Sequence, residues 1–113
     1  MLTLVDGPAA GTYWCHRAPL SLRAVVKGTE LNVLDLVTDT PDPDETIHVY
    51  RREGPAGTVR ICGRGKNAIN GWFATGRYVY MPDVDGEQFR STQAWQAWAK
   101  LQVEKEPVHA AAR

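Results

Sequence analysis

The sequence lacks most of the features that identify a secreted, membrane-bound or metal-binding protein. It holds only two cysteines, Cys15 and Cys62, which are too few for a disulfide framework and do not form the CxxC pair of common zinc sites. No run approaches the roughly 20 apolar residues of a membrane span, and the amino terminus has no basic segment followed by a long apolar stretch. We therefore expect a cytoplasmic protein with two buried thiols and with no cofactor, metal or membrane partner.

Net charge is also absent, because 13 Lys and Arg residues balance 13 Asp and Glu residues. This balance gives the whole molecule no electrostatic attraction to nucleic acid or to an anionic membrane. The 113 residues and the 43% hydrophobic fraction are typical of one ordinary soluble domain. We expect a single domain over residues 1–106, followed by a flexible tail over residues 107–113.

Glycine and proline divide the first 80 residues into short segments rich in β-branched and aromatic residues, which is typical of short strands joined by tight turns. In the clearest strand, Pro19–Val26, alternate residues are apolar, so one face is expected to be buried. Lys27 and Gly28 predict a hairpin turn to a strand at 30–37. Further strands are expected at 46–52, 58–64 and 72–80, with residues 53–57 as the tight connection between two of them. The predicted fold is mainly β, a small antiparallel β-barrel or sandwich.

The hydrophobic period changes after Pro82. Trp95, Trp98 and Leu101 recur at three-residue intervals, with polar residues on the other side. This pattern predicts one C-terminal amphipathic helix at about residues 91–105, which packs on the β structure and largely buries Trp98. Alternatively, the two indoles form a docking face for a partner protein or for a second copy of the chain.

Charge is segregated along the chain. Residues 29–45 carry six acids and no base, whereas residues 46–80 carry six bases and one acid. Two prolines within residues 38–45 indicate an exposed, extended acidic loop. Its Asp42 and Asp44 are candidate contacts with a protein partner.

The basic segment supports an alternative function. Alternation places Arg60 and Arg64 on one exposed face of a strand, with aromatic residues nearby in the sequence. Small β-barrels bind single-stranded nucleic acid by stacking bases on aromatic rings and by meeting phosphates with basic side chains. The candidate residues for this interface are Arg51, Arg60, Arg64, Lys66, Trp72 and Arg77.

No motif identifies a reacting centre. The glycine-rich segment at residues 63–67 matches neither common phosphate-binding motif, and the serines and cysteines lack a recognisable nucleophile elbow. A catalytic site assembled from distant residues would leave no such signature. We therefore expect a protein that is not an enzyme.

The segments Leu4–Tyr13 and Tyr78–Pro82, together with the Trp-rich C-terminal helix, resemble small proteins of actinobacteria and their phages. The resemblance implies a phage or prophage product that acts in the host cytoplasm by binding a host or virion protein. The aromatic content and the exposed sheet edges further suggest a homodimer. The prediction is thus a protein-binding module that uses Trp95, Trp98, Asp42 and Asp44, with nucleic-acid binding as the alternative.

Overall fold

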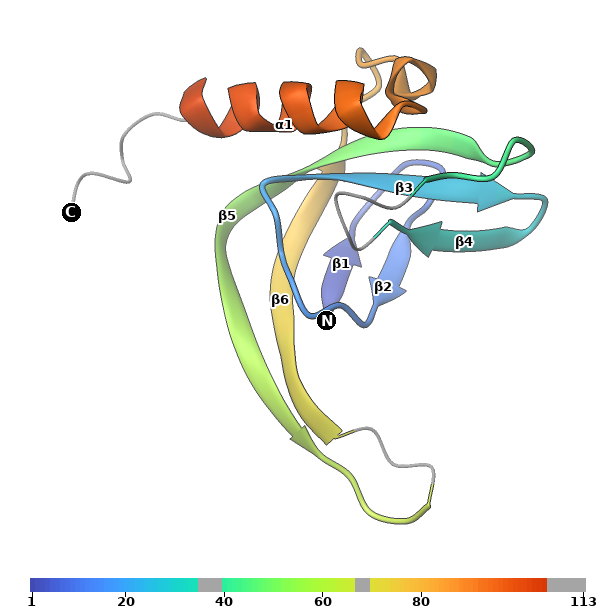
Figure 1. Cartoon of the computed structure of the whole chain (residues 1–113). Helices are drawn as coiled ribbons and strands as arrows, with labels where there is room; N and C mark the ends of the chain where they lie inside the picture. The colour runs from blue at the N-terminus through green and yellow to red at the C-terminus, as the bar shows by residue number, and fades with distance from the viewer. Residues whose placement is uncertain (35–39, 67–69, 106–113) are drawn as a thin grey trace.

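The computed structural model describes residues 1–34, 40–66 and 70–105. The strands are β1 (Leu2–Leu4), β2 (Gly11–Tyr13), β3 (Ser21–Lys27), β4 (Glu30–Val33), β5 (Thr46–Cys62) and β6 (Asn70–Tyr80), and the helices are the 3₁₀ helix η1 (Gly86–Phe89) and the α-helix α1 (Thr92–Lys105) (Figure 1). The mainly β fold with a C-terminal helix is confirmed. Neither described helix has the length and apolar character that a membrane span needs. The predicted tail at 107–113 and the last three residues of the strand expected at 30–37 lie outside the described residues.

The six strands form one curved sheet, a nearly closed barrel with the order β2-β1-β6-β5-β3-β4. Neighbouring strands are antiparallel with one exception, because β1 runs parallel to β6. Leu2 lies opposite Gly76, and Leu4 lies opposite Tyr78. This pairing joins segments from the two ends of the sheet-forming sequence, so local periodicity carries no signal for it.

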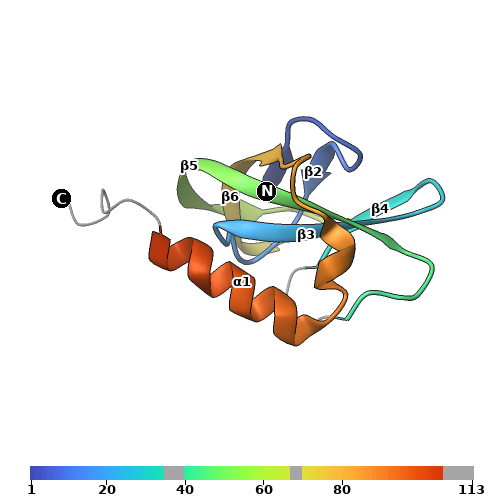
Figure 2. The ribbon, with the colours of Figure 1, turned by 90° about the horizontal axis from the view of Figure 1, so that it is seen from above.

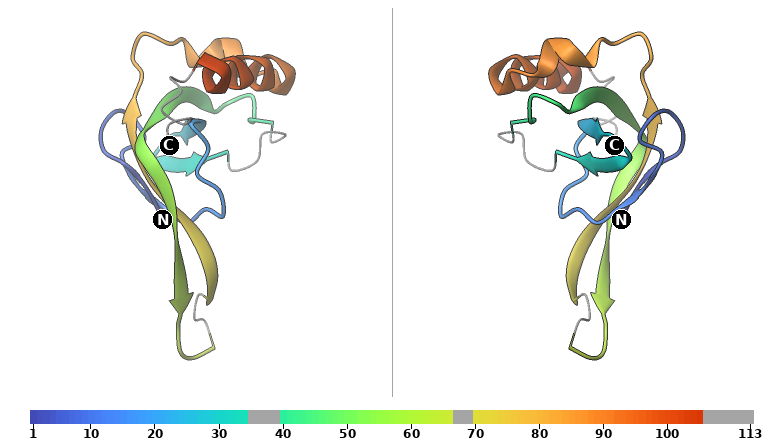
Figure 3. Two further views of the ribbon diagram at one scale, coloured as in Figure 1. Left: turned by 90° about the vertical axis from the view of Figure 1, so that its left-hand side faces the viewer. Right: turned by 90° about the vertical axis from the view of Figure 1, so that its right-hand side faces the viewer.

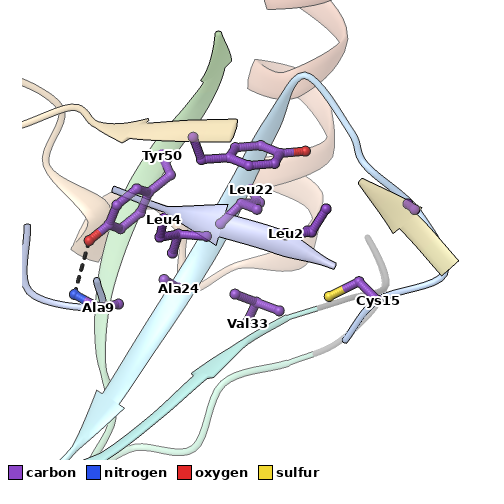
Figure 4. Close-up of a cluster of buried hydrophobic side chains, with 10 residues drawn as sticks. Leu2, Leu4, Ala9, Cys15, Leu22, Ala24, Val33 and Tyr50 are labelled. Carbon is purple, nitrogen blue, oxygen red and sulfur yellow. Dashed lines mark hydrogen bonds between the residues drawn. The ribbon is translucent and has the colours of Figure 1, made fainter. Parts of the chain in front are cut away.

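The first core fills the inside of the curved sheet (Figure 4). Leu2 of β1 and Val33 of β4 belong to this one cluster although their strands lie near opposite ends of the strand order. Side chains therefore close the barrel where backbone pairing does not. Tyr50 of β5 also lies in this core, and the backbone N–H of Ala9 donates to its hydroxyl at 2.9 Å.

The second core lies between β5 and the two helices. Its buried members are Val49, Phe89 and Trp95, and the ring centroids of Phe89 and Trp95 are 5.3 Å apart. Trp98 is only partly buried at the edge of this cluster. Trp98 is therefore less buried than Trp95, although its ring centroid lies 5.0 Å from that of Phe89. The physical reason is the helical rotation. Each residue turns the helix by about 100°, so Trp98, three residues after the buried Trp95, points about 60° away from it.

Strand β3 is covered on both faces, and the expectation of one buried face was wrong. All residues from Ser21 to Val25 are buried, because the barrel core covers one face while η1 and α1 lie over the other (Figure 2). Arg23 is 1% exposed on the helix side. Its Nη1 donates to the carbonyl of Phe89 at 2.9 Å, and its guanidinium lies 5.5 Å from the centroid of the Trp95 ring.

The predicted tight connection at residues 53–57 was also wrong, because β5 runs through it as one strand. The pairing register with β6 shifts between Glu53 and Gly57, which marks an irregular bulge. Gly54 has a φ of 76°, which favours glycine, and this bulge bends the strand without reversing it. Beyond the bulge β5 pairs with β6 alone, and these residues, 57–66 and 70–75, form a two-stranded arm that projects from the body (Figure 3).

Two expectations about exposure need correction. Cys15 is buried in the first core, but Cys62 is exposed, because no second layer of the described structure packs on the end of the arm. The acidic loop is not fully exposed, since Pro41 is buried. Arg90 fixes this loop to η1 by donating to the carbonyls of Asp42 and Glu45.

Candidate functional site

The arm carries positive charge without acidic residues. Residues 54–82 contain four bases and neither Asp nor Glu. Three of these bases, Arg60, Arg64 and Lys66, are exposed on the arm. Within the described part of the chain, no carboxylate lies within salt-bridge distance of any of the three. The arm is therefore a local excess of cations on a neutral molecule.

An exposed indole accompanies these charges. Trp72 of β6 lies directly opposite Arg60 of β5, and its side chain is 62% exposed. The guanidinium of Arg60 lies 6.0 Å from the centroid of the Trp72 ring, at the outer limit of a cation–π contact. A flat apolar surface and a positive charge are thus presented together on one face of the arm.

The opposite face of β6 carries a second aromatic cluster. Phe73 is nearly buried beneath Trp14 and His16, whose ring centroids lie 5.0 and 4.9 Å from its own. The Nδ1 atom of His16 lies 3.1 Å from the carbonyl oxygen of Trp72. Trp14 itself is 44% exposed. Because successive strand residues point to opposite faces, β6 has an exposed indole on each side at its junction with the body.

Sequence reasoning missed the part played by Trp14. Residues 14–16 lie far from β6 in the sequence, and the backbone of Ala74 holds them beside that strand by donating to the carbonyl of Cys15 at 2.9 Å. Contacts of this kind leave no local pattern. The one available signal was the alternation of Trp14 and His16 around an apolar cysteine, which is typical of an extended segment with one buried face.

The structure separates two of the predicted nucleic-acid contacts from the arm. Arg77 forms an ion pair with Glu53, with 3.1 Å between Nε and Oε1, and lies five residues, or about 17 Å along the strand, from Trp72. Arg51 is partly buried in the part of β5 that pairs with β3. The candidate interface therefore consists of Trp72 and the three arm bases.

The residues predicted to contact a protein partner differ in how accessible they are. Trp95 is 3% exposed and fills the second core, so it presents almost no surface to a partner. Asp42 and Asp44 are exposed, and the carboxylate of Asp44 lies 3.2 Å from the ammonium group of Lys27. That Asp42, Asp44 and the accessible part of Trp98 contact a partner protein stays a prediction.

A titratable pair lies where η1 meets β5. Burial lowers the pKa of His48, and the hydrogen bond that the backbone of Ile47 donates to Glu87 at 3.1 Å lowers the pKa of that carboxyl. Arg90 binds the same carboxylate at 2.7 Å. These contacts hold η1 on the sheet, and they engage both oxygens of Glu87.

Within the described ranges, no group of three or more His, Cys, Asp or Glu side chains could hold a metal ion. No protein-family model, curated protein sequence or solved structure matches the chain.

Proposed function

We propose that the protein binds single-stranded nucleic acid through its arm. Trp72 stacks on a base, and Arg60, Arg64 and Lys66 meet the phosphates. The observation that carries the proposal is the Arg60 guanidinium beside the exposed ring of Trp72, on a segment that has no acidic residue. Stacking on an aromatic ring and electrostatic attraction to phosphate are the two interactions by which proteins bind single strands without reading their sequence.

The exposed indole favours a single strand over a duplex. A two-stranded β-ribbon can enter the major groove of B-DNA, so charge and shape alone do not distinguish the two ligands. In a duplex, however, the faces of the bases are covered by their neighbours. Trp72 gains stacking contact only from unpaired bases, which contributes about 1–3 kcal/mol per stacked base.

The neutral net charge does not oppose this function, because the acids and the arm bases are separated in space. The described acidic loop precedes β5 and lies against η1, at the end of the molecule away from the arm (Figure 1). Asp44 is paired with Lys27 there. A phosphate at the arm therefore meets a positive local potential.

The first test of the proposal is how the affinity for nucleic acid depends on salt concentration. With three phosphate contacts, the logarithm of the binding constant should fall with the logarithm of salt concentration with a slope of about −2. Fluorescence anisotropy of a labelled oligothymidine of about 20 nucleotides should thus show a loss of affinity of roughly 20-fold between 50 and 200 mM salt. A labelled duplex of the same length should bind more weakly at each salt concentration.

Substitutions in the arm test the roles assigned to its residues in binding. Arg60→Glu should lower the affinity for the oligothymidine at least about tenfold, and Trp72→Ala should remove the preference for the single strand. Lys105→Glu is the matched control, because it makes the same change in net charge at an exposed position on α1. Thermal melting shows whether each variant keeps its fold. The proposal is wrong if the wild type does not bind at 50 mM salt, or if both arm variants bind as the control does.

A further inference from the structure

One edge of the arm has no neighbouring strand. In the described part of the chain, β5 pairs with β3 over Thr46–Arg51, whereas residues 57–62 of β5 pair with β6 alone. In Figure 1 no described strand lies beside the outer edge of β5 below its bend. An open strand edge presents unpaired backbone N–H and C=O groups to any extended chain that reaches it.

The strand register shows which backbone groups this edge presents. The N–H of Ala74 donates at 2.9 Å to a carbonyl between β2 and β3, and the carbonyl of Trp72 lies 3.1 Å from Nδ1 of His16. Both groups therefore point away from β5. Directly opposite residues of an antiparallel pair either both face each other or both face away. Thr58 lies opposite Ala74 and Arg60 opposite Trp72, so the N–H and C=O groups of Thr58 and Arg60 point to the open edge.

The side chains at this edge indicate which strand would fit beside it. Arg60 is exposed on one face, and no carboxylate of the described chain lies within salt-bridge distance of it. Val59 and Ile61 point to the other face and are only partly buried. Directly opposite side chains of neighbouring strands lie about 5 Å apart. An added strand therefore meets a cation on one face and apolar side chains on the other.

Charge disfavours a second copy of the same edge as the partner. Twofold antiparallel pairing of two β5 edges would place the two Arg60 side chains directly or diagonally opposite each other on one face. Arg64, which is also exposed, adds to the positive charge of each copy. Like charges opposite each other destabilise a pair of strands, and charged edge residues commonly prevent such self-association. The same charges attract a strand that carries carboxylates.

We infer that the open edge of β5 binds an extended acidic peptide of a partner protein as an added antiparallel strand. Carboxylates at alternate positions of the peptide face Arg60, and the apolar side chains between them pack on Val59 and Ile61. Main-chain hydrogen bonds to Thr58 and Arg60 give affinity, while the alternating side chains give specificity. This inference stands without the nucleic-acid function, although both ligands would use Arg60.

Three synthetic peptides test strand addition on the full chain. The first, of about eight residues, alternates glutamate with valine, has blocked ends and carries a fluorescent label. The second has N-methyl groups on the glutamate nitrogens, which face β5 in the antiparallel arrangement, and the third has them on the valine nitrogens, which face away. Fluorescence anisotropy should show saturable binding of the first and third peptides and at least about tenfold weaker binding of the second.

Thr58→Pro tests the open edge from the side of the protein. It removes an outward N–H and leaves the pairing of β5 with β6 intact, as proline does on strand edges. The affinity for the first peptide should fall at least about tenfold, whereas the matched control Thr58→Val should stay within about twofold of the wild type. Arg60→Gln should weaken the same peptide, and Lys105→Glu should not. Thermal melting shows whether each variant keeps its fold.

Several results would overturn the inference. Equal binding of the two N-methylated peptides would show electrostatic attraction without strand addition, and this comparison needs only the wild type. An unchanged affinity of folded Thr58→Pro, or no saturable binding of the first peptide, would exclude the site. Oligothymidine separates this inference from the function proposed for the arm. Binding of the peptide without oligothymidine would contradict that function alone, and binding of oligothymidine without the peptide would contradict this inference alone.

Discussion

The hydroxyl of Tyr50 ties the loop after β1 to the first core. It accepts a hydrogen bond from the backbone N–H of Ala9 at 2.9 Å and donates one to the carbonyl of Asp6 at 2.7 Å. Tyr50→Phe should lower the free energy of unfolding by about 1–3 kcal/mol, because the N–H of the buried Ala9 loses its partner. Urea denaturation measures this loss. Tyr80→Phe is the matched control, with an expected change within about 0.5 kcal/mol, and equal losses in the two variants would contradict the prediction.

The carboxylate of Glu87 makes stability depend on pH. Its pKa in the folded protein is lowered from the ordinary 4.5 by the hydrogen bond from Ile47 and by Arg90. A lowered pKa means that the stabilisation is complete above about pH 4.5 and is lost as the pH falls through the pKa of the folded state. Glu87→Gln should therefore cost about 1 kcal/mol at pH 7, after allowance for solvent screening, and much less at pH 3.

Urea denaturation of wild type and Glu87→Gln at the two pH values tests this dependence. Glu104→Gln, at an exposed position on α1, is the control and should show little change at either pH. A difference between wild type and Glu87→Gln that is the same at pH 3 and pH 7 would show that charge has no part in the contact.

At the scale of elements, α1 is attached to the sheet mainly through one indole. Trp95 contacts Phe89 and lies beneath the guanidinium of Arg23, so Trp95→Ala should lower the free energy of unfolding by about 3–5 kcal/mol. Trp98→Ala removes the same number of atoms from a partly buried position and should cost clearly less. Urea denaturation of the two variants decides the point, and a larger loss for Trp98→Ala would contradict the packing described for α1.

Elements with a strong local pattern could be predicted from the sequence. The three-residue spacing of Trp95, Trp98 and Leu101 predicts the helix, and Lys27 and Gly28 mark the turn between β3 and β4. The bend within β5 could not be predicted, because a glycine with positive φ serves a bulge as well as a turn. The choice depends on whether β6 continues to pair across the bend, which is a long-range contact.

Part of the candidate site could likewise be predicted from the sequence, and part of it could not. Alternation predicted that Arg60 would be exposed, and Trp72 was included because it lies near the basic segment in the sequence. That Arg77 is neutralised by Glu53 depends on strand register, which the sequence does not specify locally. The burial of Arg23 is a further case, since a charged residue in an alternating strand is ordinarily assigned to the solvent side.

At the scale of the whole molecule, homodimer formation stays a prediction. The exposed indoles are Trp14 and Trp72, and only the second belongs to the proposed nucleic-acid interface. Light scattering after gel filtration should give about 25 kDa, twice the 12.5 kDa of one chain. Trp14→Glu should shift this mass towards the monomer. A mass near 12.5 kDa at tens of micromolar wild-type protein would contradict the dimer.

The parallel pairing of β1 with β6 has a consequence for synthesis on the ribosome. Residues Leu2–Leu4 emerge first, but their partners Gly76–Tyr78 emerge only after β3, β4 and β5 have left the exit tunnel. Until then β1 can pair only with β2, and this pair stays separate from the rest of the sheet, while β3 and β5 can already pair with each other. The β1–β2 pair is thus among the last parts of the sheet to be placed, and a nascent chain arrested before β6 should leave this pair exposed to proteases and chaperones.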